Sequence, residues 1–247
     1  MKVFKNIFIV LVLSVFLSSC ASAVVRPIPG PIYKPAVPAV RANITHTVAP
    51  GETIWRISKM YDVSMDNIIE YNNIKRVDDL KMGERLVIPH AAPIKPVITL
   101  YPSRKWKYII IHHSATDEGN AFCFYNSHRK RGWKDIGYHF VIDNGTKGKT
   151  NGQIETTSRW LKQQNGAHCK ANSMNSRGIG VCLVGNYSEE RLSTKQLDSL
   201  VYLVNTLRKY YKVPMSNILG HGQVKGARTE CPGKLFPWAE FRRRLSE

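Results

Sequence analysis

A glycine- and proline-rich segment near the C-terminus, residues 220–233, constrains the fold of this 247-residue chain more than any other feature. It carries His221 and Cys231, and both side chains are ligand types that suit Zn²⁺. The glycines and the proline favour tight turns, which bring two residues ten positions apart back to one point. The segment therefore predicts half of a metal site.

A third ligand is expected in residues 108–116, where an apolar, β-branched run ends in His112 and His113. Such a run predicts a buried strand. Because neighbouring residues of a strand point to opposite faces, only one of the two histidines reaches the metal, and this pattern does not say which. Three protein ligands leave one coordination position open for water, as in catalytic zinc sites.

Five ordered blocks of sequence carry a family resemblance. They are residues 111–115, 132–140, 166–168 and 180–186, and His221 followed by residues 229–233. In this order they resemble the type-2 N-acetylmuramoyl-L-alanine amidases, which include phage amidase-type lysozymes and peptidoglycan-recognition proteins. The resemblance spans roughly residues 105–245. It implies a zinc enzyme that hydrolyses the amide bond between N-acetylmuramic acid and the L-alanine of the peptidoglycan stem peptide.

The resemblance also implies the site residues. One zinc ion is expected on His112, His221 and Cys231, which selects the first histidine of the pair. Tyr138 corresponds to the family tyrosine that faces the nucleophilic water, so its phenol is expected to assist catalysis.

Two further positions are less standard. Thr229 is the second expected catalytic residue and stands where phage members carry a lysine, so a cation is absent there and the general base is left unassigned. His168 matches a substrate-groove histidine, and the alternative for it is a structural histidine that caps a loop.

Residues 45–90 are expected to form a small separate domain. The pattern predicts helices over 53–61 and from Ser64 to Asn72, and a closing strand over 85–89. Residues 46–58, 72–73 and 80–89 resemble a LysM module. That resemblance implies a βααβ fold which binds glycans containing N-acetylglucosamine.

The N-terminus predicts export. Residues 1–20 combine Lys2 and Lys5 with a short apolar core, and residues 17–20 resemble a bacterial lipobox that ends in Cys20. Cys20 is therefore the expected lipid attachment site, with an ordinary secretory signal cleaved near residues 21–23 as the alternative. The resemblance of Ala21 to outer-membrane sorting signals places the expected anchor in that membrane, facing the periplasm. Residues 21–44 are rich in proline and predict an extended tether.

Charge and cysteines limit the remaining functions. A formal charge of +18 fits either a nucleic-acid-binding protein or a protein that works among anionic polymers of the cell envelope. The export signal favours the second. We expect a monomer that contacts peptidoglycan strands and stem peptides, and the membrane through its lipid. Pairing of Cys123 with Cys169 stays open, because connectivity is not readable from sequence.

The C-terminal domain, residues 105–247, is predicted to be α/β with a central mixed sheet flanked by helices. Strands are expected over 107–111, 138–143, 178–184 and 217–219, with a helix over 121–131. A capping box, Ser193 with Gln196, opens a long amphipathic helix. Residues 91–104 are expected to be a linker, with residues 97–100 left open as a strand. The alternative function is a non-catalytic peptidoglycan-binding lipoprotein.

Overall fold

The computed structural model describes residues 40–247. Ala39–Glu247 forms one compact unit. The expected signal peptide, the lipid site Cys20 and most of the tether lie outside the described residues. Among residues 40–247, none of the helices has the length and apolar character that a membrane crossing requires.

The first domain is a βααβ module. Its elements are β1 (Ala42–Thr47), α1 (Ile54–Tyr61), α2 (Met65–Tyr71) and β2 (Arg85–Ala91). Thr53 and Ser64 cap the two helices with their side-chain oxygens, as their residue types favour. The strands pair antiparallel, and the pairing of Ala42 with Ala91 shows that residues 42–44 belong to the strand rather than to the predicted tether.

The second domain contains a five-stranded mixed sheet in the order β5-β4-β6-β3-β7. Its strands are β3 (Tyr108–His113), β4 (Phe140–Ile142), β5 (Ile154–Thr156), β6 (Gly178–Leu183) and β7 (Ile218–Gly220). Only the β4–β5 pair is antiparallel. The structure thus confirms the predicted α/β fold with a mixed sheet behind a βααβ domain.

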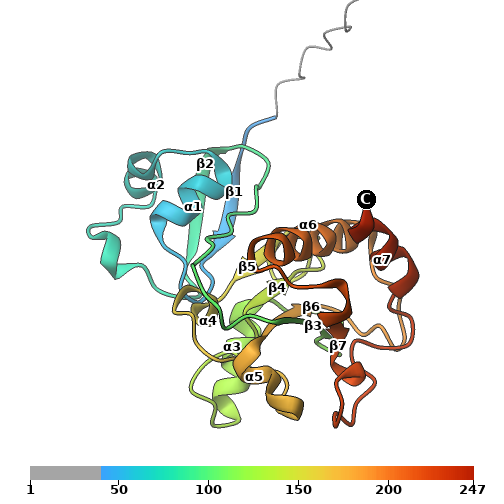
Figure 1. Cartoon of the computed structure of the whole chain (residues 1–247). Helices are drawn as coiled ribbons and strands as arrows, with labels where there is room; N and C mark the ends of the chain where they lie inside the picture. Colours follow the sequence, from blue (N-terminus) through green and yellow to red (C-terminus); the bar gives the residue numbers. More distant parts are fainter. Residues whose placement is uncertain (1–39) are drawn as a thin grey trace, which may run out of the picture. The chain divides into compact units, whose positions relative to one another are not determined.

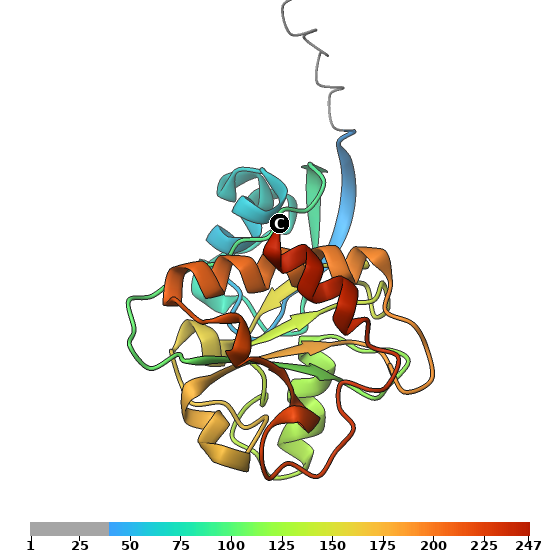
Figure 2. The same cartoon turned by 45° about the vertical axis from the view of Figure 1, so that its right-hand side comes forward.

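Helices cover both faces of this sheet, as Figures 1 and 2 show. On one face lie α6 (Thr194–Tyr211) and α7 (Trp238–Ser246), and on the other lie α3 (Ala121–Lys130) and α5 (Met174–Arg177), while α4 (Ser158–Leu161) follows β5. The period of two along β3 sorts its side chains between these layers: Ile109 and Ile111 pack with α6, and Ile110 packs on the α5 side.

Residues 92–104 connect the two domains without forming a strand. Ile94 and Val97 pack on the core of the first domain, whereas Ile98 and Leu100 pack on the core of the second. The Trp160 indole donates a hydrogen bond to the Thr99 carbonyl over 2.7 Å. This segment, called the connector below, is therefore fixed along most of its length rather than acting as a free spacer.

Candidate active site

The register of the parallel strands brings the candidate ligands together. β3 pairs with β7 so that Ile111 lies opposite Gly220, and the next residues are His112 and His221. The chain then turns back through residues 222–230, where the Gly222 amide donates to the Cys231 carbonyl over 2.7 Å. The sequence-predicted ligands therefore meet at the carboxyl ends of two adjacent strands.

The three donor side chains form a compact set. One ligand atom from each of His112, His221 and Cys231 lies within 4.8 Å of the other two. His112 and Cys231 are buried, and their Nδ1 and Sγ atoms are 3.7 Å apart. Two imidazoles and one thiol are the donor types that bind zinc in open tetrahedral sites, so the residues fit such an ion.

His113 points away from this set. Its Nδ1 accepts a hydrogen bond from the Tyr187 amide over 3.2 Å, and Tyr187 belongs to the core cluster on the α6 face. The His113 backbone still contributes, because its amide donates to Cys231 Sγ over 3.4 Å. Strand alternation thus separates the two histidines as expected, with the first on the ligand side.

His168 lies directly behind His112. Its Nε2 is 3.2 Å from the Gly178 carbonyl, which only accepts, so this nitrogen carries the hydrogen. Nδ1 of His168 then accepts from Nε2 of His112 over 3.0 Å. This arrangement turns the lone pair of His112 Nδ1 toward Cys231 Sγ, 3.7 Å away. Such a partner fixes both the tautomer and the ring orientation of a ligand.

Room for His168 comes from a glycine on β6. A Cβ at Gly180 would lie less than 3.0 Å from the His168 ring. His168 is 8% exposed, so its ring sits under the sheet rather than on an open groove. The substrate contact predicted for this residue stays a prediction, and in the structure its ring lies against His112, Gly178 and Gly180.

Burial keeps the histidine side chains of the site in their neutral form. It lowers the pKa of His112 well below 6.5, with the neighbouring histidine His168 adding to the effect, and it lowers the pKa of His168 to about 3. Burial also raises the pKa of the Cys231 thiol to about 12, and the His113 amide opposes this shift. Neutral imidazoles are the form that binds metal.

Tyr138 lies beside the ligands, with its ring centroid 5.3 Å from that of His112. Burial raises the pKa of its phenol well above 10, so the hydroxyl stays protonated and able to donate. The ring packs edge-on against Phe124 of α3 at 6.5 Å. Thr229 is exposed, and its hydroxyl accepts from the Cys231 amide over 3.2 Å, which supports the ligand loop.

The remaining histidines and cysteines do not join the ligand set. His139 is buried between the Gly180 amide and the Gln164 carbonyl, and His128 stacks on Trp133. Cys123 and Cys169 are free thiols, which answers the open question of their pairing. A separate hollow of about 240 Å³ on the first domain is lined by residues that include Asn73, Lys75 and Asp79.

Two family models match the chain. The N-acetylmuramoyl-L-alanine amidase model matches residues 102–234, and the LysM domain model matches residues 46–89. The first match covers more than half of the sequence, so this chain belongs to the N-acetylmuramoyl-L-alanine amidase family, with a LysM domain before the amidase domain.

Individual relatives and solved structures have moderate sequence identity to this chain. Peptidoglycan-recognition protein SC2 of Drosophila melanogaster is 31% identical over 145 residues, which cover 55% of this chain and 72% of the relative. N-acetylmuramoyl-L-alanine amidase of Sus scrofa is 36% identical over 120 residues, 45% of this chain but only 18% of the relative. Among solved structures, the amidase LysC from Clostridium intestinale URNW has 28% identity and a TM-score of 0.49, covering 62% of this chain and 95% of its own.

Proposed function

We propose that this chain is a zinc-dependent peptidoglycan hydrolase that cleaves the amide bond between N-acetylmuramic acid and the L-alanine of the stem peptide. The observation that carries the proposal is the meeting of His112, His221 and Cys231 beside Tyr138. Membership of the amidase family supports the bond type, and the LysM domain supports a glycan polymer as substrate.

The residues divide the work as follows. His112, His221 and Cys231 would hold one zinc ion, which when bound supplies Lewis acidity and lowers the pKa of water. His168 holds His112 in the tautomer that turns Nδ1 toward this position. The protonated Tyr138 hydroxyl donates a hydrogen bond to the amide oxygen as negative charge develops there. Thr229 steadies the loop that carries Cys231.

The second candidate is a non-catalytic peptidoglycan-binding protein. It is favoured by the recognition-protein relatives. Metal analysis of the purified protein, followed by mass analysis of muropeptides after digestion, separates the two. Free stem peptides together with about one zinc per chain support the hydrolase. Binding without any released peptide supports the alternative.

The location in the cell is part of the proposal. The lipobox-like residues 17–20 and Ala21 support a lipid anchor on Cys20 in the outer membrane, facing the periplasm. Labelling with a radioactive fatty acid tests it, because Cys20→Ala removes the label if Cys20 carries the lipid. A mature protein that fractionates as soluble periplasmic material would remove the anchor from the proposal.

A further inference from the structure

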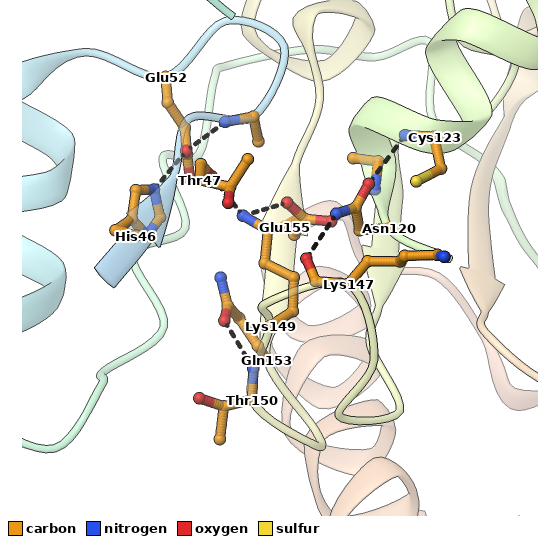
Figure 3. A network of polar contacts seen from close by, with 12 residues as sticks. His46, Thr47, Glu52, Asn120, Cys123, Lys147, Lys149, Thr150, Gln153 and Glu155 are labelled. Carbon is orange, nitrogen blue, oxygen red and sulfur yellow. Dashed lines mark hydrogen bonds and ion pairs between the residues drawn. The ribbon is translucent and has the colours of Figure 1, made fainter. Parts of the chain in front are cut away.

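The two domains share a buried ion pair network at their contact (Figure 3). Lys149 comes from the loop between β4 and β5 of the amidase domain, and its Nζ pairs with Glu155 of β5 over 2.8 Å. The same Nζ donates a hydrogen bond to the carbonyl of Thr47, at the end of β1 in the LysM domain, over 2.7 Å. The side chains of Lys149 and Glu155 are 1% and 0% exposed, so water cannot replace the LysM carbonyl while the domains are in contact.

Residues on the LysM side of the contact are also held in place by hydrogen bonds. Oε2 of Glu52 lies 2.8 Å from His46 Nε2 and accepts from the Ala49 amide over 2.6 Å. His46 and Glu52 are both buried. These bonds fix the turn between β1 and α1, which follows Thr47, the residue whose carbonyl accepts from Lys149. A buried charge is stable only where polar partners satisfy it. The conformation of the turn and the burial of the Lys149 ammonium therefore depend on each other.

Close packing extends the contact beyond the charges. A Cβ on Gly83 of the LysM domain would meet the ring of Phe122 in α3 at 2.6 Å, and one on Gly51 would meet the side chain of Leu161 at 2.9 Å. The Arg56 guanidinium on α1 donates to the Thr156 hydroxyl of β5 and to the Val97 carbonyl of the connector. Both LysM glycines have positive φ, a conformation that favours glycine.

The network continues to the candidate active site. Glu155 uses its other oxygen, Oε1, to accept from the amide of Ala121, the first residue of α3, over 2.6 Å. Ala49 of the LysM turn packs in one apolar cluster with Ala121 and Phe124, and Tyr138 packs against that cluster. The LysM turn is therefore connected to the phenol of Tyr138 through two contacts. Ala49 packs with Ala121 and Phe124 of α3, and Phe124 packs against the ring of Tyr138.

The geometry points to an intramolecular dock in which the LysM domain, held by Lys149, positions α3 and through it Tyr138. Lys149 and Glu155 are then positioning residues rather than catalytic ones, because neither touches the ligand set. This inference rests on the proposed hydrolase function for its effect on rate, whereas the dock itself does not. A LysM domain that only tethered the enzyme to glycan would leave the rate on small substrates unchanged.

The test compares two lysines of one loop in the full chain. Lys149→Met removes the buried charge and keeps a similar length. Lys147→Met is the matched control, because Lys147 is exposed and pairs only with Glu118 at the surface. Hydrogen exchange of residues 46–53 measures docking, and kcat and KM are measured on a soluble disaccharide-peptide. For Lys149→Met we expect exchange at least tenfold faster, a kcat about 10- to 100-fold lower, and unchanged KM and zinc content. Lys147→Met should behave as wild type.

The outcomes separate the dock from the proposed function. Unchanged exchange in Lys149→Met overturns the dock, and faster exchange with unchanged kcat overturns its effect on Tyr138. If the wild-type chain releases no peptide, the hydrolase proposal fails while the exchange comparison still decides the dock. Should Lys149→Met fail to fold, the double variant Lys149→Met with Glu155→Gln removes both charges. It is expected to fold and to show the same fast exchange, and wild-type exchange in it would overturn the inference.

Discussion

Nδ1 of His168 lies 3.0 Å from Nε2 of His112 and accepts its hydrogen, so a residue outside the ligand set decides which nitrogen of a ligand faces the metal position. We therefore predict that His168→Phe lowers zinc affinity about 10- to 100-fold, the usual cost of losing such a partner. Competition with a chromogenic chelator measures the affinity. His128→Gln is the control, because His128 stacks on Trp133 and makes no hydrogen bond to His112. A higher KM with unchanged zinc affinity would favour our original substrate-binding prediction for His168.

Cys231→Ala is predicted to lose the metal and the activity while the domain keeps its fold. Cys231 has a small side chain whose Sγ accepts a hydrogen bond from the His113 amide of β3 over 3.4 Å, and losing this bond leaves the pairing of β3 with β6 and β7 intact. Elemental analysis and circular dichroism check the two parts of the prediction. His113→Gln should keep its zinc, because its ring faces Tyr187. A full complement of zinc in Cys231→Ala would remove this cysteine from the ligand set.

Tyr138→Phe is predicted to retain zinc and to slow hydrolysis by roughly 10² to 10⁴, the usual contribution of one hydrogen-bonding or acid–base group. The phenyl ring preserves the contacts with Phe124 and His112, so only the hydroxyl is tested. The measurement is kcat on a soluble muropeptide. Cleavage at the original rate would make Tyr138 a packing residue.

Stability should depend on pH through Glu52. Burial alone would raise the pKa of this carboxyl, but the charge and hydrogen bond of His46, then Lys149 and the Ala49 amide, lower it from 4.5 to about 2. A lowered folded-state pKa means that the stabilisation is present above about pH 4.5 and is lost as the pH falls toward 2, by about 3 kcal/mol in total. Urea unfolding at pH 6, 4 and 3 measures it. Glu52→Gln should lose this slope, and Glu70→Gln, which changes an exposed carboxyl, should keep it.

The LysM domain should also direct the enzyme to polymer. A LysM domain that binds glycan and is fixed to the amidase domain would raise the effective concentration of substrate, commonly into the millimolar range. Removal of residues 21–90 would lower activity more on intact sacculi than on a small muropeptide. This deletion would also remove the LysM side of the dock, so it would not isolate glycan binding. Lys75→Ala with Asp79→Ala changes the LysM hollow alone. We expect about tenfold lower activity on sacculi and an unchanged rate on the muropeptide, and equal losses on both would argue against targeting.

Local patterns were sufficient for the regular elements. The capping box at Ser193 and Gln196 placed the start of α6, and the β-branched run before His112 gave β3. Short elements were missed: β5 has three residues, and its central Glu155 looks like a surface residue until Lys149 and the Ala121 amide are seen around it. A single acid between two β-branched residues, Ile154 and Thr156, was the available signal.

The residues of the candidate site were also predicted only in part. His221 and Cys231 were predicted because donor residue types and turn residues are visible in the sequence, the family resemblance selected His112 over His113, and the structure brings the three side chains together. The relation of His168 to His112 could not be predicted, because it depends on how the segment that precedes β6 packs against the end of β3, the parallel neighbour of β6 in the sheet. The fixed connector was also missed, since a proline-rich composition is shared by free spacers and by segments that pack.

Gly180 adds a residue without a ligand atom to those that the candidate metal site requires. A methyl group at this position would occupy the space of the His168 ring, and the displaced ring would no longer orient His112. A chain of this family could therefore retain every donor and still bind metal poorly after a change of one glycine to alanine. Inspection of donor residues alone is for this reason an incomplete criterion for distinguishing hydrolases from binding proteins.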